Sequence, residues 1–240
     1  MTNLQDNDFA NEIQPNLPTE DIENDHMFLI SVVRDRSGSM NQDDIPSAMQ
    51  KSTAEFIESI QKSKSDDEIL VSLTEFDDQI DSYGFRNVAD LPTHFQPRGT
   101  TDLYGAIVTA QKRLYDGNGN GYMEQLIASG VRTRGALVIW SDGKQYMPSR
   151  GKSEEEAILY DAKEGIKLLK NNEILVAIVA FGDKARGIGQ DIGITPQNIL
   201  ETSATAGDLR KIWGILSKSA ISQSKTTAAG ATASQGFFTV

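Results

Sequence analysis

The sequence predicts an α/β fold in three layers: a doubly wound, mostly parallel sheet with helices on both faces and one antiparallel edge strand. Short, nearly continuous apolar runs rich in Val, Ile and Leu occur along the chain, and such runs are typical of strands buried on both faces of a parallel sheet. Segments with apolar residues at every third or fourth position lie between them, which is the period of a helix. Strands alternating with helices predict βαβ units with right-handed crossovers.

Four apolar runs predict the inner strands: residues 27–33, 69–73, 136–140 and 174–180. Residues 79–86 are more polar and follow a turn at Asp77 and Asp78, so we expect an antiparallel edge strand there. A last short strand is expected near 198–202, after Pro196.

Four apolar stripes predict helices whose inner faces belong to the core: residues 45–60, 103–114, 158–169 and 209–220. Asp43 and Asp44 precede the first stripe, and carboxylates are favourable near the positive end of a helix dipole.

The chain of 240 residues is long enough for one large domain, which we place at residues 27–222. Residues 1–26 hold seven Asp or Glu and no Lys or Arg, and we predict a flexible acidic arm. Residues 223–240 are rich in Ser, Thr, Ala and Gly and predict a flexible low-complexity tail. The tail ends near Phe237 and Phe238, which either form a docking tag or pack back onto the body.

The overall charge argues against nucleic acid as a partner. The formal net charge is −11 and no basic run is present, whereas non-specific nucleic-acid binding needs clustered Lys and Arg. The sequence has no Cys, so neither disulfides nor thiolate zinc sites are expected. We find no signal peptide and no apolar run of membrane-spanning length, and therefore expect a cytoplasmic protein that does not enter a membrane.

Three polar loops are expected at the carboxyl ends of the predicted strands, where open α/β sheets bind ligands. Asp35, Ser37 and Ser39 follow the first strand, Gly99 to Leu103 open a helix, and Ser141, Asp142 and Gly143 follow the 136–140 strand. Hydroxyl and carboxylate oxygens of this kind suit Mg²⁺.

An apolar strand with Asp-x-Ser-x-Ser, then Gly-x-Thr-x-Leu at a helix start, then an apolar strand with Asp-Gly resembles a von Willebrand factor A (vWA) domain with a metal-ion-dependent adhesion site. The resemblance implies that Ser37 and Ser39 ligate the cation through their hydroxyls. It implies a third hydroxyl from Thr101, with Thr100 as the alternative. Asp35 and Asp142 would hold coordinated waters or enter the coordination shell. The implied cation is Mg²⁺, with Mn²⁺ or Ca²⁺ as alternatives.

A non-enzymatic function follows from this resemblance. An acidic side chain of a protein partner would complete the coordination shell of the cation. The chain looks most like the bacterial intracellular vWA proteins of tellurium-resistance and stress-response clusters. This resemblance implies that it acts as a scaffold together with protein kinases and phosphatases.

Two alternatives stay open. A metal-assisted hydrolase would need a general base, for which Asp77, Asp102 and Asp183 are available. A vWA scaffold with a silent metal site would follow if Arg34, which precedes Asp35 where an apolar residue is usual, took the place of the cation. We expect Arg34 and Arg36 to point towards solvent instead.

The loop that begins at Asp116 starts like a calcium-binding EF-hand, but its twelfth position is Ile127 rather than Glu. We therefore predict a surface loop there.

Overall fold

The computed structural model describes residues 13–42, 44–63, 68–142, 145–181, 183–202, 205–228 and 237–238. Within them lies a six-stranded sheet in the order β3-β2-β1-β4-β5-β6. The strands are β1 (His26–Asp35), β2 (Glu68–Phe76), β3 (Ile80–Asn87), β4 (Arg132–Ser141), β5 (Leu175–Phe181) and β6 (Ile199–Thr202). Only the β2–β3 pair is antiparallel among these strands. The predicted fold class and edge strand are confirmed.

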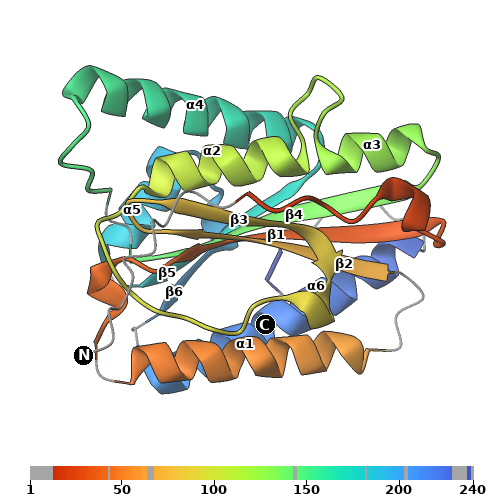
Figure 1. The fold of residues 1–240 in the computed structure, drawn as a ribbon, viewed down its shortest axis with the longest axis horizontal. Coiled ribbons are helices and arrows are strands. Elements are labelled where there is room, and N and C mark those ends of the chain that lie inside the picture. The colour runs from red at the N-terminus through yellow and green to blue at the C-terminus, as the bar shows by residue number, and fades with distance from the viewer. Residues whose placement is uncertain are drawn as a thin grey trace, which may run out of the picture.

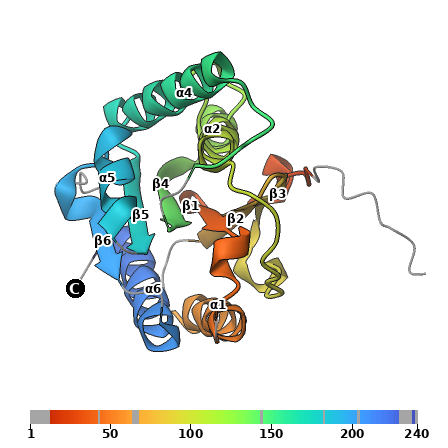
Figure 2. The same cartoon turned by 90° about the vertical axis from the view of Figure 1, so that its left-hand side faces the viewer.

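Helices cover both faces of the sheet (Figures 1 and 2). One face carries α1 (Ile45–Gln61) and α6 (Ala206–Ala228), and the other carries α2 (Leu103–Leu114), α3 (Tyr122–Ala128) and α4 (Lys152–Asn171). The remaining helix, α5 (Asp183–Asp191), contacts β5 and β6. The four apolar stripes correspond to α1, α2, α4 and α6, whereas α3 and α5 are too short for a stripe to reveal them. Among the described stretches, no helix has the length and apolar character needed to cross a membrane.

The central strand β1 separates two apolar cores. Its side chains alternate between the faces, as in any strand: one set joins α1 and α6, and the other joins α2 and α4. The first set is Phe28, Ile30 and Val32, and the second is Met27, Leu29 and Val33. Because this alternation continues to the end of β1, Arg34 and Asp35 point to opposite faces.

The order of the strands reverses at β1. The chain runs from β1 through β2 to β3 at one edge, and then returns to β4 and continues through β5 to β6 at the other. The ends of β1 and β4 therefore form the switch point at which open α/β sheets bind ligands.

The first described residues lie along the edge of the sheet, where the sequence predicted part of a flexible arm. The Gln14 amide donates to the Ser82 carbonyl at 2.8 Å, and the Leu17 amide donates to the Phe85 carbonyl at 2.7 Å. A Cβ at Gly84 would collide with the carbonyl of Pro15, so this glycine permits the close approach. The segment covers the exposed edge of β3, and the body of the domain extends upstream of the predicted boundary at residue 27.

The C-terminal boundary also differs from the prediction. Helix α6 continues to Ala228, six residues beyond the expected end of the domain at 222. Phe237 is fully buried, and its amide donates to Asn198 Oδ1 at 2.8 Å. Of the two alternatives for the terminal aromatics, packing onto the body is the one observed for Phe237. Residues 1–12, 229–236 and 239–240 of the predicted arm and tail lie outside the described residues.

Candidate metal centre

The end of β1 delivers a buried carboxylate to the switch point. Asp35 is fully buried. Its Oδ1 accepts the Ser37 amide at 2.8 Å, and its Oδ2 accepts the Ser141 hydroxyl at 2.8 Å. Ser141 is the last residue of β4, so Asp35 ties the loop after β1 to the end of the neighbouring strand.

The two serines of the motif lie together. Ser37 Oγ and Ser39 Oγ are 3.0 Å apart, because the chain turns into a short 3-10 helix at Gly38–Met40. Ser37 is buried, whereas Ser39 is partly exposed. The structure thus brings Asp35, Ser37 and Ser39 into one cluster, as the sequence predicted.

The loop before α2 packs directly against this cluster. The Gly38 amide donates to the Gly99 carbonyl at 3.2 Å, and the Arg98 amide donates to the Arg36 carbonyl at 2.8 Å. Gly99 has a φ of +63° and no room for a Cβ against Asp78, which explains a glycine at this turn.

The two candidate threonines of this loop differ in their surroundings. Thr101 is 5% exposed and exchanges two backbone hydrogen bonds with Tyr146. Thr100 directs its hydroxyl to the sulfur of Met147 at 3.5 Å. The structure therefore gives Thr100 another hydrogen-bond partner and leaves Thr101 as the better candidate for a third hydroxyl ligand.

Asp142 follows Ser141 and is partly exposed. Its charge lies close enough to Asp35 to contribute to that group's titration. Burial, with a smaller contribution from the Asp142 charge, raises the pKa of Asp35 to about 6 against the lowering effect of its hydrogen bonds from Ser37 and Ser141. The Asp142-Gly143 turn is described only as far as Asp142.

The two arginines beside Asp35 do not point towards solvent, so that prediction is wrong. Arg34 is fully buried on the opposite face and binds Glu75 Oε1 through Nη2 at 2.6 Å. Its Nη1 donates to Thr53 at 3.0 Å, and its guanidinium lies 5.2 Å from the Phe95 ring centre. The charge of Arg34 is therefore neutralised within the core, away from Asp35.

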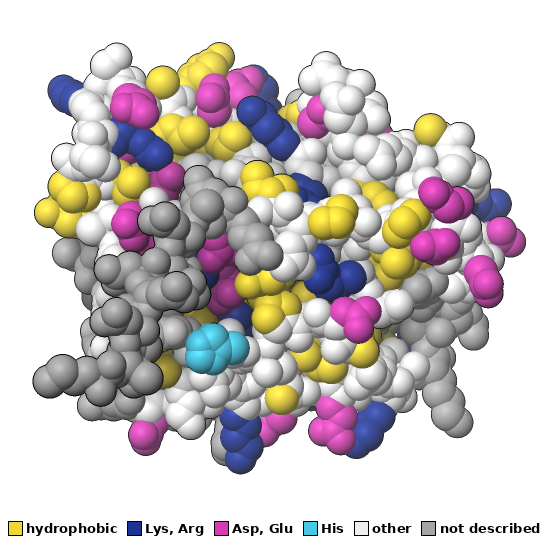
Figure 3. All heavy atoms as spheres, viewed as in Figure 1, with side chains coloured by type: hydrophobic (Ala, Val, Ile, Leu, Met, Phe, Trp, Pro, Cys, Tyr) yellow, Lys and Arg dark blue, Asp and Glu magenta, His cyan; other side chains and the backbone are white. Residues whose placement is uncertain are grey.

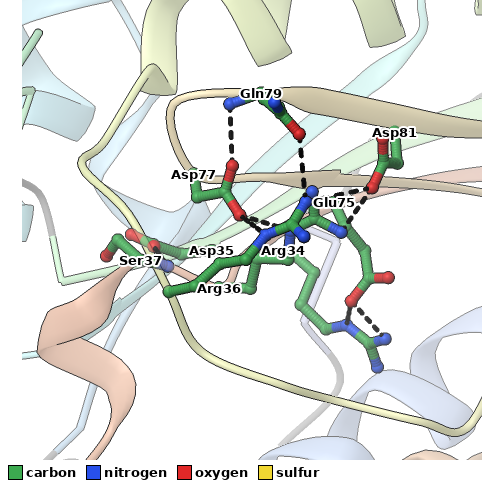
Figure 4. Close-up of polar contacts among 9 residues, drawn as sticks. Arg34, Asp35, Arg36, Ser37, Glu75, Asp77, Gln79 and Asp81 are labelled. Carbon is green, nitrogen blue, oxygen red and sulfur yellow. Dashed lines mark hydrogen bonds and ion pairs between the residues drawn. The ribbon is translucent and has the colours of Figure 1, made fainter. Parts of the chain in front are cut away.

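Arg36 is also buried and ion-paired (Figure 4). Its Nε donates to Asp77 Oδ2 at 2.9 Å, and its Nη1 lies 2.5 Å from Asp81 Oδ2. Neither arginine occupies the position of a cation beside Asp35.

Sequence reasoning missed Asp77 as the residue that joins the loops. Its Oδ2 also accepts Nε of Arg98 at 2.6 Å, and its carbonyl accepts the Asp102 amide at 2.7 Å. One buried side chain thereby holds the loops after β1 and before α2 together. Its position at the carboxyl end of β2 was the available signal, because that is where open sheets place functional side chains.

Asp102 and Arg150 fix the start of α2. Asp102 caps the helix by accepting the Gly105 amide, and both of its oxygens accept Arg150, at 2.7 and 2.8 Å. Bidentate pairing of this kind is strong and directional. The pair places Thr101, the preceding residue, in a rigid loop.

In the loop that begins like an EF-hand, the acidic side chains accept hydrogen bonds from backbone amides of the loop itself. Asp116 accepts the amides of Asn118 and Asn120 at 2.8 and 3.1 Å, and Glu124 accepts the Gly119 amide at 3.0 Å. Residues 117–120 are exposed, so the predicted surface loop is confirmed.

No group of three or more His, Cys, Asp or Glu side chains is arranged to hold a metal in the described part of the chain. The candidate metal ligands at the ends of β1 and β4 are of another kind, because they comprise three hydroxyls and two carboxylates.

Comparison with known proteins supports the fold class. No protein-family model matches the sequence, and the comparison with curated proteins found no relative. The structure is similar to the pilus adhesin SpaC of Lactobacillus rhamnosus GG, with a TM-score of 0.57 and 15% identity. The match covers 89% of this chain and 31% of the adhesin. It is also similar to proximal thread matrix protein 1 of the mussel byssus, with a TM-score of 0.52 and 11% identity over 91% of this chain and 49% of that protein.

The chain therefore spans a third to a half of the proteins it resembles in structure. At such low identity the similarity defines the fold alone. Together with the strand order, it supports an α/β fold with a mostly parallel sheet and helices on both faces.

Proposed function

We propose that this chain is a non-enzymatic protein-binding module that holds Mg²⁺ at the switch point and grips an acidic side chain of its partner. The observation that carries the proposal is Asp35. It is fully buried at the meeting point of three loops, and within the described structure it contacts only neutral donors. A buried carboxylate without a cationic partner is costly, and a cation from outside the chain would offset that cost.

The donor set fits a hard divalent cation. Mg²⁺ prefers oxygen ligands, binds few carboxylates and keeps several waters. The residues that would hold it are Asp35, Ser37, Ser39, Thr101 and Asp142. Bound there, the ion would supply an open coordination position with affinity for a carboxylate.

Hydrogen bonds and the balance of charge within the chain favour cation binding at this site. The bonds from Ser37 and Ser141 fix the orientation of the Asp35 carboxylate. Of the five proposed ligands, only Asp35 and Asp142 carry a charge that offsets the divalent charge, so attraction for a third carboxylate remains. At a partly exposed site, unit charges about 4 Å apart interact by about 4 kcal/mol at an effective dielectric of 20, and desolvation of the partner's carboxylate opposes that gain.

Two proteins of similar fold are a pilus adhesin and a matrix protein of the mussel byssus, and the binding role is brought to this chain only by analogy with them. The bacterial stress-response or tellurium-resistance setting, kinase and phosphatase partners and a cytoplasmic location are proposed from the sequence resemblance alone.

The hydrolase alternative has no supporting observation in the described structure. Asp77 and Asp102, two of its three candidate bases, are bound in ion pairs with Arg36 and Arg150. The side chain of the third, Asp183, lies outside the described residues.

Calorimetric titration with Mg²⁺ and Mn²⁺ tests the proposal. We expect saturable binding by the wild type and none by Asp35→Ala or Asp142→Ala, whereas Asp90→Ala, an exposed carboxylate on the turn after β3, binds as the wild type does. Absence of binding by the wild type, or equal binding by all four proteins, would refute the assignment.

A further inference from the structure

Residues 13–17, called the edge segment below, are fixed to the outer edge of the sheet by side chains as well as by backbone. The Phe85 amide donates to Asn16 Oδ1 at 2.9 Å. Arg113, on α2, donates through Nη1 to the Gln14 carbonyl at 2.7 Å and to Asn16 Oδ1 at 3.2 Å. Contacts within the chain alone therefore determine where the edge segment lies.

The edge segment runs parallel to β3, with Ile13 beside Ser82. Figure 1 shows it, in red, along β3. Because β3 begins with Ile80 opposite Phe76, the last residue of β2, the chain upstream of Ile13 leaves from the end of the sheet that carries the candidate metal loop. Residues 1–12 lie outside the described residues, but they are attached at this end.

The register of the sheet gives the separation between Ile13 and Asp35. Ser82 is opposite Thr74, which is opposite Val33. Ile13 is therefore level with Val33, two residues before Asp35 in the same strand. Three strand spacings of about 4.8 Å and two residue rises of about 3.3 Å then place the two Cα atoms about 16 Å apart.

Residues 1–12 hold three carboxylates and no Lys or Arg. An extended chain spans at most about 3.6 Å per residue. Asp6, seven residues before Ile13, therefore reaches about 25 Å, Asp8 reaches about 18 Å, and Glu12 reaches about 4 Å. Asp6 spans the distance to Asp35 with chain to spare, Asp8 spans it only when nearly extended, and Glu12 falls short.

The surface between the edge segment and the metal loop carries charges of both signs that are already paired. Arg36 pairs with Asp77 and Asp81. Arg98 pairs with the same two carboxylates. Figure 3, in which the β3 edge faces the viewer, shows acidic and basic side chains close together on this face. Neutralised arginines attract a further carboxylate weakly, so they do not hold an acid of residues 1–12 before it reaches the metal loop.

The candidate metal site is accessible on one side only. Asp35 is fully buried, whereas Ser39 and Asp142 are partly exposed. A cation held by these residues would therefore keep its open coordination position towards solvent, on the side of Ser39 and Asp142.

We propose that Asp6 or Asp8 of the same chain takes this open coordination position while no partner is bound. The inference rests on the proposed function, because it needs the cation. Tethering gives such a carboxylate an effective concentration in the millimolar range. A lone carboxylate from solution therefore competes poorly with it, whereas a partner that makes further contacts displaces it. The N-terminal residues thus act as an internal competitor that restricts the site to partners with a larger interface.

Mn²⁺ in place of Mg²⁺ tests the contact directly, because this paramagnetic ion broadens the NMR signals of nearby nuclei. In the nitrogen-labelled full chain, Mn²⁺ should broaden the amide signals of Ser39 and Thr101, which report occupancy of the site. It should also broaden those of Asp6 and Asp8. The double variant Asp6→Asn with Asp8→Asn should retain the broadening at Ser39 and Thr101 and lose most of it at positions 6 and 8.

Two controls exclude other causes of broadening at positions 6 and 8. Equal broadening there in the wild type and the double variant would show that the tether alone brings the residues near the ion, and would overturn the proposal. Asp35→Asn, which removes the central ligand, should abolish broadening at all four positions. Broadening that persists at positions 6 and 8 in Asp35→Asn would mean that these residues bind Mn²⁺ by themselves, which also contradicts the proposal.

Binding measurements test the competition. Because coupling between two ligands is reciprocal, a carboxylate supplied by the chain tightens Mg²⁺ binding and opposes an external carboxylate. Asp6→Asn with Asp8→Asn should therefore weaken Mg²⁺ binding at least about twofold and strengthen the Mg²⁺-dependent binding of a capped peptide with a single Asp at least about twofold.

Glu12→Gln with Glu20→Gln is the matched control, because it removes the same charge. Glu12 is out of reach of the metal loop, and Glu20 is exposed in the turn that follows the edge segment. Both affinities should stay at their wild-type values. Equal changes in the two double variants would assign the effect to net charge and refute the contact.

The outcomes separate this inference from the proposed function. If Mn²⁺ broadens Ser39 and Thr101 but not positions 6 and 8, the metal site stands and the internal competitor is refuted. If Mn²⁺ broadens none of the four signals in the wild type, the metal site itself is refuted and the internal competitor falls with it.

Discussion

Arg34 and Asp35 are neighbours on β1, and the protein treats their charges in opposite ways. Arg34 points to one face, where Glu75 and Thr53 neutralise it completely. Asp35 points to the other face, where only neutral donors from Ser37 and Ser141 contact it in the described structure. Both residues are fully buried. A buried charge that is paired internally is part of the structure, whereas one that is left unpaired is available to a cation that the chain does not contain.

The largest expected effect on stability comes from breaking the ion pair between Arg34 and Glu75. Glu75→Leu leaves the Arg34 charge buried without a partner, and such a change costs about 3–5 kcal/mol of unfolding free energy. The double variant Arg34→Met with Glu75→Leu removes both charges, and should recover most of that loss because a buried ion pair replaced by apolar groups is about neutral. Urea denaturation of the wild type and both variants measures the difference. A double variant as unstable as the single one would mean that the pair contributes more than charge neutralisation.

The second largest effect is the stabilisation that Mg²⁺ should provide at Asp35. Mg²⁺ at about 100 times its dissociation constant should stabilise the protein by about 2.7 kcal/mol, because the cation compensates the charge of Asp35 only in the folded state. For a chain of this size each kcal/mol raises the melting temperature by about 2–4 °C. Thermal unfolding with Mg²⁺ and with EDTA checks this. Asp35→Asn is the matched variant and should show no Mg²⁺-dependent shift.

Without metal, the same substitution should stabilise the protein. Because burial raises the pKa of Asp35 to about 6, the folded state favours the protonated acid. The cost of its charge is absent below the ordinary pKa near 3.8, grows between that value and about 6, and is fully present above. Its full size is about 3 kcal/mol. Asn forfeits one acceptor and with it about 1 kcal/mol, so Asp35→Asn should gain about 2 kcal/mol at neutral pH in EDTA.

The measurement for this prediction is the difference in unfolding free energy between wild type and Asp35→Asn as a function of pH. Taking the difference cancels the titration of other groups. The gain should disappear and turn into a loss of about 1 kcal/mol as the pH falls below about 4, where only the missing acceptor of Asn remains. A constant difference between pH 4 and 7 would show that the Asp35 charge is not the cause.

The same two residues show what the sequence could and could not predict. The Asp-x-Ser-x-Ser loop at a strand end and the two later loops are local patterns, and they predicted that Asp35, Ser37 and Ser39 lie together. The burial and pairing of Arg34 depend on Glu75, which is 41 residues away in the sequence. The two are directly opposite in the β1–β2 register, and the apolar pattern of the two strands did not fix that register. The bonds between Asp77 and Arg36 or Arg98 likewise depend on how three loops pack, which no local pattern contains.

The smallest effect on stability, and the most specific test of the unpaired side, is Ser39→Ala. Ser39 is partly exposed and its hydroxyl contacts Ser37 Oγ, so its removal should change the unfolding free energy by no more than about 0.5 kcal/mol. Loss of a hydroxyl ligand should nevertheless weaken Mg²⁺ binding by at least about tenfold, as changes around metal sites commonly do.

Ser59→Ala is the control for this variant, because among the described residues that hydroxyl bonds only to its own helix, at the Glu55 carbonyl. Calorimetry should show unchanged Mg²⁺ affinity for the control. If Ser39→Ala and Ser59→Ala bind Mg²⁺ equally well, the hydroxyl of Ser39 is not a ligand, and any cation beside Asp35 must be held by another set of residues.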